Sequence, residues 1–307
     1  MPLETIDVEA LERIVIDKCE NFVQMGLWPA GDTITYKRWL ANFSTEDKEM
    51  ALYLLNAFTY YNKDFCVALL KAAIVDISRR TLDNSSFRTS KTQWISFLSK
   101  TIFVPATGES RNITDSGVNL SSYLRRTLKI SETQILTVDD LYSASYKGFL
   151  ESSYDNVIFF DDLIGSGNQF ITMFNDEFEK DTDLLDSVGK RCKTLNLKPF
   201  YCVMMGTRYG IERINNRCPE VELSCAHIIT PSDSPYHEEC SIWPSRLKEN
   251  SLNFLTRAAE KAGIKESEMR GYHNLGLVIA FEWTIPDCTI PIFSTKNPNW
   301  SALMEKI

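Results

Sequence analysis

The sequence lacks several patterns that would assign a protein to a class at once. None of its eight cysteines is paired in a C-x-x-C spacing, so a structural zinc site has little support. No run of 18 apolar residues occurs, and no membrane-spanning helix is predicted. Basic residues number 33 against 41 acidic ones. The resulting net charge of −8 argues against general binding to the backbone of DNA or RNA.

Histidine is also scarce. The three histidines are His227, His237 and His273, and no two of them have the i,i+4 spacing of a pair of metal ligands on a helix. No direct ligation of a metal by side chains is therefore predicted. The first ten residues, MPLETIDVEA, are acidic and lack the layout of a secretory signal. We expect a cytoplasmic protein with reduced, mostly buried thiols.

Glycine is absent between Gly31 and Gly108, and most of this part of the chain has helical periodicity. Helices are predicted over residues 50–61 and 65–77. An earlier helix is indicated by apolar residues at helical spacing: Val8, Leu11, Ile14, Val15 and Cys19. We predict an N-terminal helical region over residues 1–95, which packs against the rest of the chain or binds a partner protein.

Beyond residue 95 the pattern changes to short apolar runs that alternate with helical stretches. The predicted strands cover residues 101–105, 134–138, 156–160, 200–205 and 221–229. This alternation predicts an α/β domain over residues 96–307, with a mostly parallel sheet flanked by helices. Its last part, from about residue 230 to 307, is expected to form a small C-terminal cap. There, residues 275–283 and 289–293 are expected to form an antiparallel pair.

The residues that carry chemistry follow the predicted strand at 156–160. Asp161 and Asp162 stand at the carboxyl end of this strand, where ligands bind in open α/β sheets. A carboxylate offers two acceptor oxygens and suits the hydroxyl groups of a sugar. The pair therefore predicts a site for a sugar diol.

A short glycine-containing loop comes next and opens a helix. Gly165 and Gly167 allow the backbone to approach a ligand closely. Backbone amides at the start of a helix bind phosphate groups well. Those amides belong to Ser166, Gly167, Asn168 and Gln169. A phosphate site beside a diol site outlines ribose 5-phosphate.

The order of these parts resembles the phosphoribosyl-pyrophosphate motif of type I phosphoribosyltransferases. Ser166 and Gly167 match the loop of that motif, whereas Gly165 replaces a hydroxyl residue and Gln169 replaces the closing threonine. The resemblance covers about residues 96–295. It implies a magnesium-dependent glycosyltransferase that binds phosphoribosyl pyrophosphate, with Asp161 and Asp162 as catalytic residues that hold the ribose hydroxyls.

The resemblance also implies a pyrophosphate loop after an early strand. Gly108, Ser110 and Arg111 hold that position, and Arg111 would neutralise charge on the leaving group. An ordinary polar turn is the alternative. Arg208 and Tyr209, which follow the strand at 200–205, are candidates for contact with a base, and a turn is again the alternative.

A closer resemblance is to the phosphoribosyltransferase-like proteins of bacterial conflict systems, including retron-type anti-phage modules. It rests on the segment RWLANF at residues 38–43, on the two aspartates, and on the tail at residues 273–293. It implies anti-phage defence and a phosphoribosyl or nucleotide ligand. Two other functions stay open. One is a non-catalytic module that senses such a ligand and signals to a partner protein through the N-terminal helices; the other is an effector that degrades nucleotides.

Overall fold

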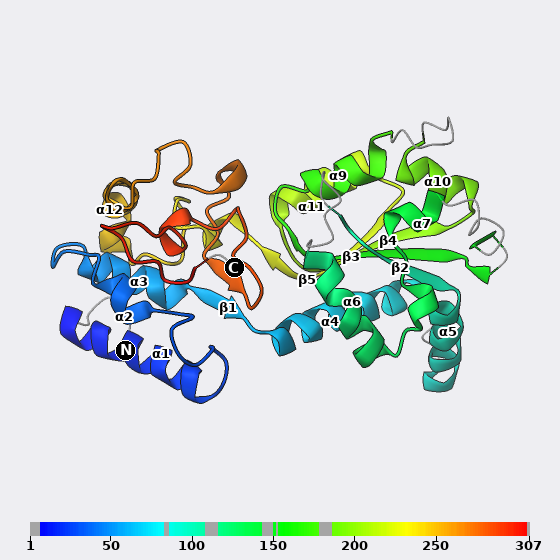
Figure 1. Cartoon of the computed structure of the whole chain (residues 1–307), viewed down its shortest axis with the longest axis horizontal. Helices are drawn as coiled ribbons and strands as arrows, with labels where there is room; N and C mark the ends of the chain where they lie inside the picture. The colour runs from blue at the N-terminus through cyan, green and yellow to red at the C-terminus, as the bar shows by residue number, and fades with distance from the viewer. Residues whose placement is uncertain are drawn as a thin grey trace. The chain divides into compact units, whose positions relative to one another are not determined.

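The chain folds as two compact units, one of which is inserted in the other. The computed structural model describes residues 7–82, 86–107, 116–142, 150–151, 153–177 and 186–305. Residues 64–229 form the inserted unit, and residues 1–63 together with 230–307 form the flanking unit. In Figure 1 the blue start and the orange-to-red end of the chain accordingly lie together in the flanking unit.

The flanking unit is built mainly from helices around a small parallel sheet. Its strands β1 (Thr59–Tyr61) and β6 (Ile279–Phe281) pair in parallel. Its helices are α1 (Val8–Gln24), α2 (Tyr36–Leu40), α3 (Lys48–Ala57) and α12 (Lys248–Lys261). Short 3₁₀ turns complete it: η3 (Pro231–Asp233), η4 (Ser245–Leu247), η5 (Tyr272–Asn274) and η6 (Pro291–Phe293).

Helix α1 begins where its sequence provides a cap. The Asp7 carboxylate accepts hydrogen bonds from the amides of Glu9 and Ala10, at 2.8 and 3.0 Å. Leu11, Val15 and Cys19 are buried along one face of the helix. Val8 and Ile14 belong to the predicted stripe but remain exposed, because the buried face of this helix is narrower than the apolar pattern.

Aromatic side chains join the two segments of the flanking unit. The ring of Trp39 lies 5.3 Å from that of Phe293, and the ring of Phe43 lies 5.3 Å from that of Trp300. The sequence predicted a boundary at residue 95 and a C-terminal cap on the α/β domain, and the structure divides the chain differently. Periodicity shows that a helix has a buried face but not which segment covers that face. The packing of the N-terminal segment against the C-terminal one could therefore not be predicted from the sequence.

The predicted antiparallel pairing in the tail is wrong. Leu277 and Thr289 form an isolated bridge in parallel orientation. Strand β6 pairs with β1, which belongs to the N-terminal segment. The residues from Pro291 to Phe293 turn as η6 instead of continuing as a strand. Proline at position 291 favours this helical turn, because its fixed φ suits the first position of a helix.

The inserted unit is an α/β fold with a parallel sheet, as predicted. Its strands are β2 (Thr101–Pro105), β3 (Asn156–Ile164), β4 (Lys198–Thr207) and β5 (Glu222–Ile229), in the order β2-β3-β4-β5. The strand predicted at residues 134–138 does not join this sheet. Only Ile135 forms an isolated parallel bridge, to Phe103, and the segment is divided between the short turn η2 (Glu132–Gln134) and helix α7 (Val138–Tyr142).

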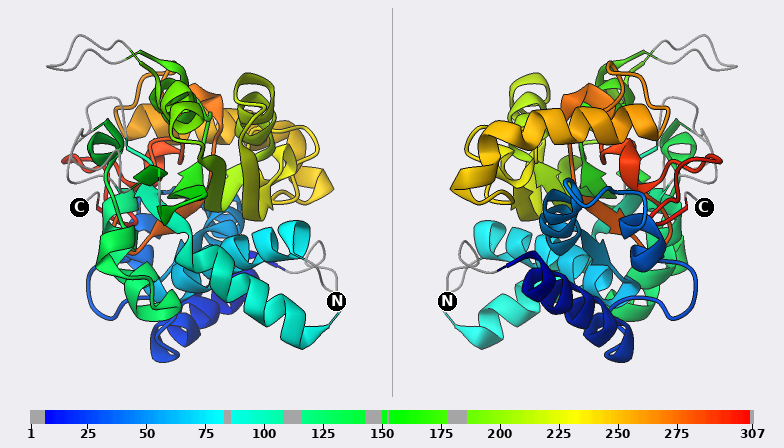
Figure 2. Two further views of the ribbon diagram at one scale, coloured as in Figure 1. Left: turned by 90° about the vertical axis from the view of Figure 1, so that its right-hand side faces the viewer. Right: turned by 90° about the vertical axis from the view of Figure 1, so that its left-hand side faces the viewer.

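Helices cover both faces of this sheet. On one side lie α7, α9 (Asn168–Asn175), α10 (Val188–Thr194) and α11 (Arg208–Arg217); on the other lie α4 (Lys63–Thr81), α5 (Phe87–Ser99) and α6 (Ser116–Leu128) (Figure 1). In the left view of Figure 2 the cyan helices α4 and α5 again lie below the strands of the sheet. Phe159 packs against Phe170 on the first side, and Phe200 against Phe97 on the second. Among the described helices, none is long and apolar enough to cross a membrane.

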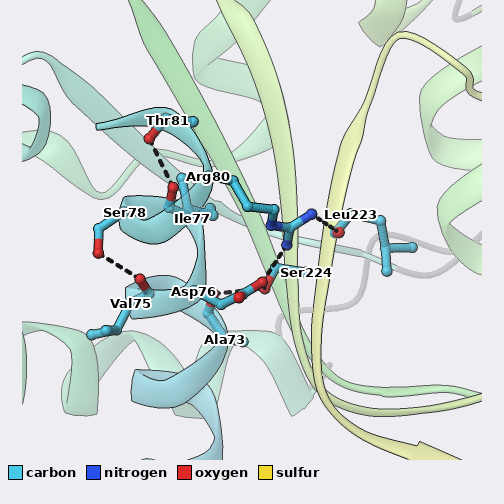
Figure 3. Close-up of polar contacts among 9 residues, drawn as sticks. All are labelled: Ala73, Val75, Asp76, Ile77, Ser78, Arg80, Thr81, Leu223 and Ser224. Carbon is cyan, nitrogen blue, oxygen red and sulfur yellow. Dashed lines mark hydrogen bonds and ion pairs between the residues drawn. The ribbon is translucent and has the colours of Figure 1, made fainter. Parts of the chain in front are cut away.

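Polar contacts attach α4 to strand β5 (Figure 3). The buried Ser224 hydroxyl lies 2.7 Å from the carbonyl oxygen of Ala73 and 3.0 Å from Asp76 Oδ2. Arg80 donates to the same carboxylate oxygen and to the carbonyl oxygen of Leu223, the latter over 3.1 Å. These contacts fix the helix against the last strand of the sheet.

Candidate functional site

The two aspartates of the motif lie near the carboxyl end of β3, between β2 and β4. The sequence predicted that the strand ends at residue 160, with the aspartates after it. The strand instead continues to Ile164, so both aspartates lie within it. Asp161 and Asp162 are only 3% and 6% exposed. The pairing with β4 runs to Asp161 opposite Val203 and resumes at Leu163, which leaves Asp162 at an interruption of the ladder.

Asp161 is held by three donors. Its Oδ1 accepts from the amide of Asp162 at 2.9 Å, and its Oδ2 accepts from Gln169 Nε2 at 3.3 Å and from the Tyr201 hydroxyl at 3.4 Å. Burial raises the pKa of Tyr201 well above its ordinary value, and the nearby charges of Asp161 and Asp162 raise it further. The hydroxyl therefore stays protonated and donates to the carboxylate.

The loop after β3 enters helix α9 through a residue that must be glycine-like. Gly167 has φ of +78° and is the N-cap residue of α9, with no side-chain cap. Ser166 is buried, and its hydroxyl accepts from the amide of Asn168 at 3.3 Å. The predicted loop residues 165–169 thus follow the end of β3, and two residues separate them from Asp162.

The end of strand β4 and helix α11, which follows it, contact this loop. The Thr207 hydroxyl donates to the carbonyl oxygen of Gly165 and accepts from the amide of Gly210 at 3.0 Å. Arg213 donates to the carbonyl oxygen of Ser166 at 2.6 Å. Neither Thr207 nor Arg213 was predicted from the sequence to contact the loop. The available signal was threonine at an N-cap position before a helix.

The two residues proposed for contact with a base lie at the start of α11. Arg208 and Tyr209 are both exposed, and Tyr209 is 46% exposed. The guanidinium of Arg213 lies over this ring, 5.3 Å from its centre. Their role toward a base stays a prediction.

A further hydroxyl lies at the end of β2. Thr107 follows Ala106, whose amide donates to the carbonyl oxygen of Phe160 at 2.9 Å, so this segment runs beside β3 up to the aspartates. The Thr107 hydroxyl is buried and has no hydrogen-bond partner within the part of the chain that the structure describes. Gly108, Ser110 and Arg111, the predicted pyrophosphate loop, lie outside the described residues.

The donor set suits magnesium better than a transition metal. No group of three or more histidine, cysteine, aspartate or glutamate side chains that could hold a metal is found among the described residues. Magnesium is commonly bound by one or two carboxylates together with water and substrate phosphates. Two buried carboxylates beside the glycine-containing loop fit that pattern, provided that a phosphorylated ligand supplies the remaining oxygens.

Comparison with known proteins places this chain in a family. No curated protein matches the chain. The family model described as PRTase-CE matches residues 36–306, which include both aspartates, the loop after β3 and helix α11. The match extends over both units and over most of the chain. The chain therefore belongs to the PRTase-CE family and contains a phosphoribosyltransferase-like domain.

Proposed function

We propose that the inserted unit binds phosphoribosyl pyrophosphate or a related ribose 5-phosphate ligand at the carboxyl end of β3. The observation that supports this proposal is the succession of two buried carboxylates and a glycine turn that opens α9. Asp161 and Asp162 would accept hydrogen bonds from the ribose hydroxyls. The loop at residues 165–169 would hold the 5-phosphate through backbone amides at the start of α9.

The proposed reaction is transfer of the phosphoribosyl group, which makes the protein a glycosyltransferase. A nitrogen nucleophile forms a bond to the anomeric carbon, and pyrophosphate departs with the electron pair of the broken C–O bond. The transition state has oxocarbenium character, so the chain acts mainly by orienting the diol and the phosphate. Magnesium, bound mainly through oxygens of the ligand beside Asp162, would neutralise negative charge on the leaving group.

The proposed diol site is also supported by the contacts that hold Asp161 in a fixed orientation. Tyr201 donates to Asp161, and its ring stacks on Phe170 with the centres 3.8 Å apart. This stacking fixes the hydroxyl that orients the carboxylate. We also propose a cellular role in anti-phage defence, which is supported by the sequence resemblance alone.

Calorimetric titration with phosphoribosyl pyrophosphate and magnesium tests the binding. We expect Asp162→Asn to weaken binding by about ten- to a hundredfold, because hydrogen bonds to a charged acceptor contribute about 1.5–3 kcal/mol. Asp155→Asn is the matched control, since Asp155 lies just before the same strand, is exposed and pairs only with Lys100 at its surface. Absence of binding by the wild-type protein would overturn the proposal.

A second function is favoured by one contact. Gln169, which stands where the motif has threonine, donates to Asp161 Oδ2 and so engages an oxygen that a sugar hydroxyl would use. This arrangement suits a module that binds the ligand without turnover. Release of pyrophosphate in the presence of a mixture of bases separates the two functions. Release identifies a transferase, and tight binding without release identifies the sensing module.

A further inference from the structure

The N-cap residue and a side chain of helix α11 hold the loop at residues 165–169, the proposed phosphate loop, by hydrogen bonds to carbonyl groups of the loop. The Gly165 carbonyl accepts from the Thr207 hydroxyl, and the Ser166 carbonyl accepts from Arg213. These are two consecutive carbonyls of the loop that precedes α9. Both of them therefore point toward α11.

The planarity of the peptide bond gives this contact a consequence. In a trans peptide the C=O and the N–H of the same unit point in opposite directions. The Gly165 carbonyl shares its peptide unit with the amide of Ser166, and the Ser166 carbonyl shares its unit with the amide of Gly167. Anchoring the two carbonyls on α11 therefore turns these two amides away from α11 and makes them available to a ligand.

The anchor is in direct backbone contact with the loop. A Cβ atom on Gly210 would lie 2.3 Å from the carbonyl oxygen of Gly165, and one on Gly167 would lie 3.0 Å from the carbonyl oxygen of Gly210. Behind the contact, Ile214 is fully buried. On the outer side, the Tyr209 ring supports the Arg213 guanidinium. The loop is thus fixed from several directions before any ligand arrives.

We infer that Thr207 and Arg213 are positioning residues, which orient the amides of Ser166 and Gly167 toward the phosphoryl group of the ligand. The inference rests on the proposed function. Neither side chain needs to touch the ligand, because each acts through a carbonyl of the loop. Donors that are fixed in advance bind an anion without the cost of reorganisation.

Two pairs of variants test the inference on the full-length protein. Arg213→Gln replaces the long, charged guanidinium by a shorter, neutral amide, and Thr207→Val removes the hydroxyl that donates to Gly165. Arg213→Lys and Thr207→Ser keep a charged group and a hydroxyl at these places. Arg217→Gln, an exposed change one turn further along α11, is the matched control. Calorimetry with ribose 5-phosphate should show binding about tenfold weaker for the first pair, with most of the affinity kept by the second pair and by the control.

Spectra of protein labelled with ¹⁵N-glycine supply a readout that does not depend on affinity. Arg213→Gln should move the amide signals of Gly165 and Gly167 before ligand is added, and leave those of Gly26 and Gly31 in place. If wild-type protein binds and Arg213→Gln and Thr207→Val bind equally well, the inference fails while the proposed function stands. If the wild-type protein does not bind ribose 5-phosphate or phosphoribosyl pyrophosphate, both fail.

Discussion

Trp39 and Trp300 donate to the same acceptor, the carbonyl oxygen of Ile292, through indole nitrogens at 3.0 and 2.9 Å. A carbonyl oxygen has two lone pairs and can accept both bonds. Both rings are buried, and they come from the two segments of the flanking unit. This shared acceptor ties the N-terminal segment to the C-terminal one.

Replacement of Trp300 by phenylalanine should weaken the flanking unit. The change removes one of the two hydrogen bonds and part of a buried ring, and we expect a loss of about 1–3 kcal/mol in the free energy of unfolding. Urea denaturation followed by circular dichroism measures the loss. Trp94→Phe, in the half-buried helix α5, should cost less; an equal cost for the two variants would contradict the role of Ile292 as a shared acceptor.

Alanine at position 210 should destabilise the protein although it lies in a helix. Alanine favours a helix over glycine by about 1 kcal/mol. Its Cβ would, however, lie 2.3 Å from Gly165 O and 2.6 Å from Ile164 Cγ2, and overpacking of this kind costs about 1–3 kcal/mol or more. We expect a lower urea midpoint for Gly210→Ala than for wild type. Glu212→Ala, an exposed change in the same helix, should leave the midpoint nearly unchanged.

Removal of the Ser224 hydroxyl should loosen the contact between α4 and β5. This buried group lies between Ala73 and Asp76, and without it the Ala73 carbonyl and the Asp76 carboxylate lose a donor. We expect Ser224→Ala to cost about 1 kcal/mol in urea denaturation. Ser78→Ala is the control, because the Ser78 hydroxyl donates only to Val75 within α4 (Figure 3). Equal costs would show that the link to β5 adds nothing.

Stability should fall at alkaline pH because thiols are buried. Burial raises the pKa of Cys192 to about 12, whereas an unfolded thiol ionises near pH 8.5. Between these values the unfolded chain loses a proton that the folded protein keeps. The buried Cys192 thiol therefore contributes fully to the free energy of unfolding below pH 8.5. Above that pH its contribution falls by about 1.4 kcal/mol per pH unit. Denaturation series from pH 8 to 11 should show a shallower decline for Cys192→Ala, and no such change for the exposed neighbour variant Thr194→Ala.

The parallel sheet was predictable because its strands are buried on both faces. Such strands have continuous apolar runs, as at residues 101–105 and 200–205, and the sequence alone locates them. The segment at 134–138 has a similar composition but is held otherwise. Gln134 Nε2 donates to the carbonyl oxygens of Leu98 and Thr101, at 2.7 and 2.8 Å. These side-chain hydrogen bonds hold the segment in place of the backbone hydrogen bonds of a strand.

The candidate site was predictable where its parts are contiguous, from Asp161 to Gln169. What surrounds it depends on strands that meet only after folding. Tyr201 and Arg213 come from β4 and α11, and no spacing in the sequence connects them to the loop. Pairing of the two chain ends is equally non-local, since β1 and β6 acquire their register from the tertiary fold.

The insertion also sets an order of events during biosynthesis. Residues 64–229 leave the ribosome between the two halves of the flanking unit. At 5–20 residues per second, about ten to forty-five seconds pass between the synthesis of β1 and that of β6. During that interval Trp39 and its apolar neighbours lack the residues that bury them. We therefore expect chaperones to bind the N-terminal segment of the nascent chain more than the inserted unit.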